Sequence, residues 1–331
     1  DAFYGCSSLA DVTFGENSQL TSIEWEAFYD CSSLASIEIP SGVTSIGSSA
    51  FEGCSSLSSI EIPSGVTYIG GSAFSGCSSL ADVTFGENSQ LTSIESFAFR
   101  GCSSLSSIEI PSGVTSIGSG AFSGCSSLAD VTFGENSQLT SIGSYAFIYC
   151  SSLASIEIPS GVTSIETEAF GDCSSLADVT FGENSQLTSI GSYAFENCSS
   201  LTSIEIPSGV TSIDSSAFYY CSSLETIIVE EGNSVYDSRG NCNALIETAS
   251  NTLMLGCKNT IIPETVTTIG VSAFMQCSGL TNVAFAENSQ LTFIGDNAFS
   301  YCSDLASIEI PSGVTSIGSS AFYRCSGLTN V

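Results

Sequence analysis

A cysteine recurs every 23 or 25 residues along most of this chain, within nearly the same sequence each time. The fullest form is A-F-x-x-C-S-S-L-x-x-I-x-I-P-S-G-V-T-x-I-G, as from Ala50 to Gly70. The in-register cysteines are Cys6, Cys31, Cys54, Cys77, Cys102, Cys125, Cys150, Cys173, Cys198, Cys221, Cys277, Cys302 and Cys325. Such a repeat is typical of a solenoid, whose units bury their apolar residues only against their neighbours. We therefore predict a single solenoid over residues 1–331.

Within one repeat, the residues alternate as they do in a half-buried strand. In the repeat over residues 31–54, Ile37 and Ile39 are expected to point into the core. Ser36 and Glu38 alternate with them and are expected to face solvent. The Pro-Ser-Gly that follows would end the strand, because proline cannot donate to a strand ladder.

The segment before the next cysteine is the part that could be helical. Residues 47–51 are too few for an independent helix, so a single helical or 3₁₀ turn is predicted there. Long repeats, such as residues 77–102, carry two more residues than short ones. The extra length falls in the polar run Gly86–Gln90, where a turn tolerates insertion.

These motifs carry a family resemblance. L-x-x-I-x-I followed by P-x-x-V-x-x-I-G-x-x-A-F-x-x-C resembles the BspA-like class of leucine-rich repeats, over nearly all of the chain. The resemblance implies a right-handed leucine-rich-repeat superhelix, with parallel β-strands on one face and short helical or 3₁₀ turns. It also implies a cell-surface or secreted protein of bacteria or some protists, several members of the class being adhesins.

The charge of the chain is strongly one-sided. Thirty-four acidic residues stand against four basic ones, giving a formal net charge of −30. Phosphate backbones and anionic membranes would repel such a surface, so no nucleic-acid partner is expected. No apolar run is long enough to span a membrane, and no signal peptide opens the chain. Both ends fall inside a repeat, so we expect a segment of a longer protein or ends that meet other copies.

The cysteines are expected to be structural. No C-x-x-C pair occurs, so a zinc site is not indicated. Equivalent cysteines of neighbouring turns would form a column about 4.8 Å apart, but with side chains that point the same way. We expect buried thiols that pack as small apolar groups, beside a column of the phenylalanines of A-F.

The period fails after Cys221, where residues 231–257 depart from the repeat. Two apolar alternating runs around Thr248–Asn251 predict a β-hairpin-like insert within the solenoid. Cys242 and Cys257 are out of register, and either a disulfide between them or two buried thiols is compatible with the sequence.

Nothing in the sequence points to catalysis. The chain has no histidine, which excludes Ser-His and Cys-His arrangements and the commonest metal ligand. No phosphate-binding loop or nucleophile elbow occurs, and the carboxylates recur in a series rather than as one singular pair. We expect a non-enzymatic protein without a cofactor, and weak binding of divalent cations is left open.

Outward carboxylates recur along the predicted strands. Short repeats place a Glu after the first inward Ile, and long repeats place an Asp before the inward Val, which staggers like charges. The resulting candidate binding strip consists of Asp11, Glu38, Glu61, Asp82, Glu109, Asp130, Glu157, Asp178, Glu205 and Glu309. The strip could recruit cationic segments or divalent ions, or it could be a solvated face that only keeps the protein soluble.

The monotony of this strip suits a repetitive partner. We predict a surface or secreted protein that mediates adhesion by binding an extracellular protein or a repetitive polymer, with cationic groups, through the acidic strip. The alternative is a structural protein that assembles head-to-tail into a filament through homotypic end contacts, since such contacts need not close.

Overall fold

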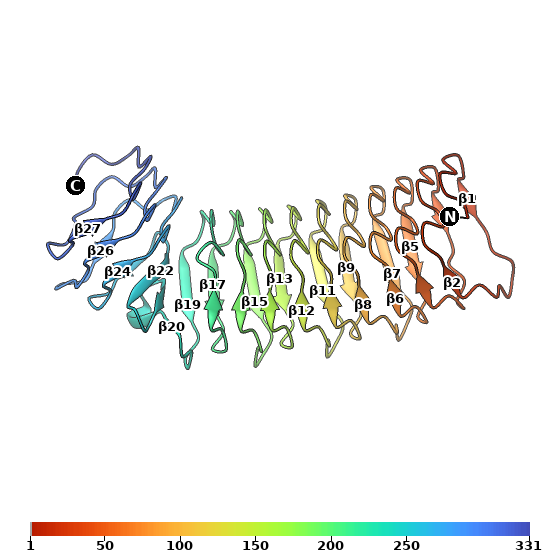
Figure 1. Ribbon diagram of the computed structural model, residues 1–331, viewed down its shortest axis with the longest axis horizontal. Helices are drawn as coiled ribbons and strands as arrows, with labels where there is room; N and C mark the ends of the chain where they lie inside the picture. The colour runs from red at the N-terminus through yellow and green to blue at the C-terminus, as the bar shows by residue number, and fades with distance from the viewer. Residues whose placement is uncertain (1) are drawn as a thin grey trace.

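The computed structural model describes residues 2–331 as a stack of turns along one long axis, with the chain termini at opposite ends (Figure 1). Almost all of its elements are short parallel β-strands. Within residues 2–331, the single helical element is the 3₁₀ segment η1 (Arg239–Asn241). The predicted fold class, a leucine-rich-repeat solenoid of parallel strands, is confirmed.

The first side of each turn is the predicted I-x-I strand. In β5 (Ser59–Ile62), Ile60 and Ile62 are buried, and Ser59 and Glu61 alternate with them at the surface. Equivalent strands are β1 (Asp11–Val12), β3 (Ser36–Ile37), β7 (Asp82–Phe85), β9 (Ser107–Ile110), β11 (Asp130–Phe133), β13 (Ser155–Ile158), β15 (Asp178–Phe181), β17 (Ser203–Ile206) and β19 (Thr226–Val229). These strands pair in twos, as β5 does with β7.

The second side is a continuous parallel sheet, where the sequence did not predict strands. It contains β2 (Ser22–Ile23), β4 (Ser45–Ile46), β6 (Tyr68–Ile69), β8 (Ser93–Ile94), β10 (Ser116–Ile117), β12 (Ser141–Ile142), β14 (Ser164–Ile165), β16 (Ser189–Ile190) and β18 (Ser212–Ile213), nine strands in all. We call it the Thr-Ser-Ile sheet. The Thr67 hydroxyl donates to the Thr44 carbonyl of the preceding turn at 3.3 Å, and this bond recurs from turn to turn.

The third side, here called the turn edge, is the A-F-x-x-C segment, and the helical or 3₁₀ turn predicted there is wrong. Residues 47–54 form successive β-turns, with φ of +54° at Ser49 and +75° at Gly53. A positive φ interrupts a right-handed helix. The Phe51 amide instead donates to the Ala73 carbonyl of the next turn at 2.7 Å, so this side is also a hydrogen-bonded ladder.

Phenylalanines and cysteines of the turn edge form two columns in the core, as expected. Phe51 and Phe74 stack with ring centroids 5.2 Å apart and planes 5° from parallel. The Cys77 thiol donates to the Phe51 carbonyl at 3.1 Å, and the same bond recurs along the column. All cysteines are free thiols, including the out-of-register Cys242 and Cys257.

The two extra residues of a long repeat lie between its two strands, as the sequence indicated. Ser59 pairs with Asp82 and Tyr68 pairs with Ser93, so nine positions separate the strands of the short repeat and eleven those of the long one. The resulting turn crosses close over the preceding one. A Cβ at Gly86 would lie 2.7 Å from the Ser64 backbone nitrogen, so glycine is required there.

Replacing this glycine therefore tests the stacking of the turns. Gly86→Ala is expected to lower the free energy of unfolding by about 1–3 kcal/mol, because the backbone must shift to admit the methyl group. Gly65→Ala is the matched control, since its Cβ would meet nothing closer than 3.7 Å. Urea unfolding followed by circular dichroism measures both. Equal stability of the two variants would contradict the close approach.

Residues 231–257 interrupt the parallel stack. Here β20 (Tyr236–Asp237) pairs antiparallel with β21 (Ala244–Glu247), and β21 pairs antiparallel with β22 (Thr252–Gly256). A parallel sheet then resumes from β22 through β24 (Thr268–Ile269), β26 (Phe293–Ile294) and β27 (Ser316–Ile317), while β23 (Ile261–Ile262) pairs with β25 (Ala284–Phe285).

The turns on either side of the insert lie in direct contact. On the turn edge, the Ser278 hydroxyl donates to the Ser222 carbonyl at 2.9 Å, so turns 56 residues apart lie in contact. The Phe274 ring packs directly on Gly256, where an added Cβ would lie within 2.1 Å of the ring. The turns that follow the insert are inclined to those before it (Figure 1).

Candidate functional site

The ten carboxylates of the predicted strip are all exposed, and each belongs to a first-side strand or its direct equivalent. They are Asp11, Glu38, Glu61, Asp82, Glu109, Asp130, Glu157, Asp178, Glu205 and Glu309. Inward neighbours such as Ile108 and Val131 are 3% and 5% exposed, so the alternation of the strand places the carboxylates outward. We call this surface the acidic face.

The strand register staggers the carboxylates as predicted. Asp82 lies opposite Ser59, and Glu61 lies opposite Thr84, so both of these carboxylates have a hydroxyl beside them on the paired strand. At the first pair of strands the Ser36 hydroxyl donates to Asp11 Oδ1 at 3.1 Å. Direct opposition of like charges, which destabilises a sheet, is avoided within each strand pair.

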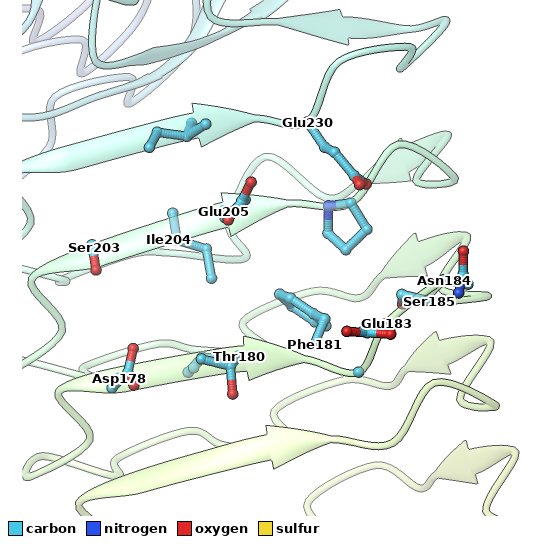
Figure 2. Close-up of a pocket in the computed structure, with 14 residues that line it drawn as sticks. Asp178, Thr180, Phe181, Glu183, Asn184, Ser185, Ser203, Ile204, Glu205 and Glu230 are labelled. Carbon is cyan, nitrogen blue, oxygen red and sulfur yellow. The ribbon is translucent and has the colours of Figure 1, made fainter.

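Carboxylates from three successive turns line one hollow of about 400 Å³ on the acidic face. Asp178 and Glu205 come from the first-side strands β15 and β17. Glu183 comes from the Gly-Glu-Asn turn of the long repeat, and Glu230 from the turn after β19. In Figure 2 the labelled side chains rise from neighbouring ribbons of the solenoid, with Glu183 beside Phe181. The hollow is open, and its charged groups are all negative.

Similar hollows recur along the acidic face. Asp82 and Glu109 line one of about 680 Å³, and Asp11 and Glu38 line one of about 700 Å³. Glu157 lines another of about 500 Å³. The remaining strip residues, Glu61, Asp130 and Glu309, are exposed but do not line these four hollows. Three of these four hollows thus bring together a long-repeat carboxylate of the strip and the next short-repeat carboxylate.

Sequence reasoning missed the glutamates at the rim of these hollows. The signal was available, because a Glu-Asn pair follows the first-side strand of each long repeat after one small residue and so puts an acid, such as Glu183, at the end of the strand. The turn is held by Asn184 at φ +58°, to whose carbonyl Gln186 Nε2 donates at 2.8 Å. Glu230 is held by the Ser208 amide, which donates to its carboxylate at 2.6 Å.

The chemistry available at the acidic face is attraction of cations. Within residues 2–331, no group of three or more Asp, Glu or Cys side chains is arranged to hold a metal ion. The two ion pairs of the described chain, Arg239–Asp237 and Lys258–Glu225, involve no residue of the strip. The carboxylates of the strip are therefore available to charges brought by a partner.

Comparison with known repeat families identifies the chain. The model of the BspA type leucine rich repeat region matches residues 1–91, 87–185, 140–249 and 251–331. The chain belongs to this family. The resemblance inferred from L-x-x-I-x-I and A-F-x-x-C is confirmed, and leucine-rich repeat families are in general non-enzymatic. No curated protein sequence matches the chain.

Solved structures of bacterial leucine-rich repeat proteins are similar to the chain. One from Bacteroides ovatus is 30% identical with a TM-score of 0.67, over 96% of this chain and 83% of that one. One from Eubacterium ventriosum is 29% identical with a TM-score of 0.48, over 61% and 59% of the two chains. A leucine rich cell surface protein from Faecalibacterium prausnitzii is 28% identical with a TM-score of 0.43, over 97% and 85%. Among residues 2–331 there is no helix long and apolar enough to cross a membrane.

Proposed function

We propose that the acidic face binds cationic groups of an extracellular protein or repetitive polymer, and that the protein acts in adhesion at a cell surface or in secreted form. The observation that carries this proposal is the recurrence of one kind of carboxylate-lined hollow along the solenoid. Membership of the BspA-type family supports a binding role.

Binding of this kind has to be multivalent. An exposed ion pair contributes only about 0.2–1 kcal/mol, so a single hollow would hold a cationic partner weakly. Repetition along the axis lets a second and third contact form at high effective concentration once the first has formed. A repetitive cationic partner would therefore gain affinity with each turn that it covers.

The proposal predicts that removing charges from the acidic face weakens binding more than removing charges elsewhere. A triple variant, Glu109→Gln, Glu157→Gln and Glu205→Gln, is expected to bind poly-lysine roughly tenfold more weakly, at ~0.5 kcal/mol per lost ion pair. The control carries Glu24→Gln, Glu95→Gln and Glu166→Gln, which follow the Thr-Ser-Ile sheet and remove the same charge. Biosensor measurements at low and high salt compare them.

Equal weakening of both triple variants would contradict a site on the acidic face, because it would mean that net charge alone attracts the polymer. In that case the face only keeps the protein soluble. Light scattering of the unmodified chain tests the head-to-tail alternative separately, since a filament would have a mass far above that of one chain.

A further inference from the structure

A second surface, on the turn edge, carries aromatic and acidic side chains that the acidic face does not use. The rings of Tyr193 and Tyr219 meet edge to face, with centroids 5.8 Å apart and planes at 79°. Tyr219 and Tyr220 are 6.2 Å apart at 59°. All three rings are half-buried, so each keeps part of its face open to a ligand.

Three carboxylates lie on the same stretch of the turn edge. The Asp172 amide donates to the Glu196 carbonyl at 2.8 Å and the Glu168 amide to the Ser192 carbonyl at 3.0 Å, so these residues lie on adjoining turns. Burial raises the pKa of Glu196, and the negative charges of Glu168 and Asp172 raise it further. Asn197 Nδ2 donates to Asp172 Oδ1 at 2.6 Å. Neither of the two ion pairs within residues 2–331 includes any of these three carboxylates.

The chain's own arginines show what the rings of the turn edge accept. The Arg324 guanidinium lies 5.5 Å from the ring centroids of both Tyr301 and Tyr323. At a second place on this edge, Arg100 lies 5.7 Å from the centroid of Phe97. Two of the three arginines of the chain are thus placed over aromatic rings of this edge.

The turn edge continues across the insert. Beyond it, the Gln276 amide donates to the Ser300 carbonyl at 2.8 Å, directly before Tyr301. The contact of Ser278 with Ser222 brings the turns after the insert against those before it. At one end of this edge Arg324 lies over the rings of Tyr301 and Tyr323. Towards the other end, the Asn197 amide donates to the Tyr219 carbonyl at 2.8 Å, which places Tyr219 on the turn next to Glu196, a carboxylate in neither ion pair of residues 2–331.

We propose that Tyr193, Tyr219 and Tyr220, together with Glu168, Asp172 and Glu196, bind an arginine side chain of a partner polypeptide. We call these residues the tyrosine patch. A guanidinium stacks flat on an aromatic ring and presents a planar fork that matches a carboxylate, whereas a lysine ammonium does neither. The strong negative charge of the protein draws such a cationic segment to the patch.

The choice between arginine and lysine tests the proposal. Oligoarginine and oligolysine peptides of equal length and label are titrated into the protein at physiological salt, with binding followed by fluorescence anisotropy. The unmodified chain is expected to bind oligoarginine about fivefold more tightly. Tyr219→Leu is expected to reduce that preference about two- to fivefold, the contribution of one exposed ring. Tyr219→Phe keeps the ring and is expected to keep the preference.

Two further variants locate the effect. Tyr68→Leu, at a ring 38% exposed on the Thr-Ser-Ile sheet, is expected to leave the preference unchanged. Glu196→Gln is expected to weaken oligoarginine binding more than oligolysine binding. Equal affinity of both peptides for the unmodified chain would overturn the proposal, as would an unchanged preference in a Tyr219→Leu variant with an intact circular dichroism spectrum. The acidic-face triple variant is expected to weaken the binding of both peptides alike and to leave the preference for oligoarginine unchanged. The experiment therefore distinguishes a failure of the acidic-face proposal from a failure of the tyrosine-patch proposal.

Discussion

Alkaline pH is expected to unfold this solenoid, with its buried thiols as the cause. Burial raises the pKa to about 12 for four fully buried cysteines, from an ordinary value of about 9: Cys54, Cys125, Cys173 and Cys302. The folded chain therefore keeps these protons at a pH where the unfolded chain releases them. The stabilisation is present below pH ~9 and is lost as the pH rises towards ~12.

The size of the effect is comparable to the whole stability of a domain. Each thiol loses about 1.4 kcal/mol of stabilisation per pH unit above its unfolded pKa, so at pH ~10.5 the four lose roughly 8 kcal/mol together. A typical domain is stable by about 5–15 kcal/mol. Circular dichroism between neutral and alkaline pH, in a reducing buffer and with a return to neutral pH, measures the transition.

A variant without two of the thiols separates their titration from that of the tyrosines. The double variant Cys125→Ala and Cys173→Ala is expected to unfold at a higher pH, because two groups that favour the unfolded chain at alkaline pH are gone. Its stability at neutral pH would fall slightly through the loss of two small buried groups. A midpoint pH that does not move would show that the buried thiols are not what destabilises the protein.

Truncating one ring of the phenylalanine column is expected to have the largest effect of any single substitution discussed. Phe122 lies between Phe99, at 5.4 Å, and Phe147, at 5.2 Å, and its side chain is fully buried. Phe122→Ala is expected to lower the free energy of unfolding by about 3–5 kcal/mol, since it removes a buried ring and leaves a cavity in the column. Urea unfolding measures this loss.

The same substitution is also expected to make the solenoid unfold in two steps rather than one. Each turn of a solenoid contacts only its neighbours, so a weakened turn in the middle uncouples the turns on either side. Limited proteolysis of Phe122→Ala is expected to cut near the cavity before the rest of the chain is degraded. Phe97→Ala is the control, because Phe97 is 40% exposed. A loss of stability equal to that of the control would contradict the role of the column.

The features that could be predicted from the sequence are those that depend on residues close together in the chain. Ile60 and Ile62 point inward and Glu61 outward because neighbouring residues of a strand alternate between faces, and that follows from order alone. The type of turn over residues 47–54 did not follow, because polar and small residues there suit a helical turn as well as β-turns. The bond from the Phe51 amide to the next turn selected the β-turns.

The candidate sites also combine residues that the sequence indicated with residues that only the structure brought together. The sequence indicated Asp178 and Glu205 as outward carboxylates, but the hollow between them also required Glu183 and Glu230, from two other segments. The tyrosine patch was missed altogether. Tyr193 and Tyr219 occupy different positions within their repeats, so no periodic pattern relates them, and their rings meet only because of how successive turns stack.

By itself, then, the amino-acid sequence determined the solenoid, its two repeat lengths, its buried columns and the side of the strand on which the carboxylates lie. Each of these follows from short-range alternation copied from turn to turn. Only the tertiary structure decided how far one turn is offset from the next, where the insert inclines the axis, and which acids and tyrosines meet. Those features depend on contacts between residues more than twenty positions apart, whose geometry is set by backbone hydrogen bonds between turns.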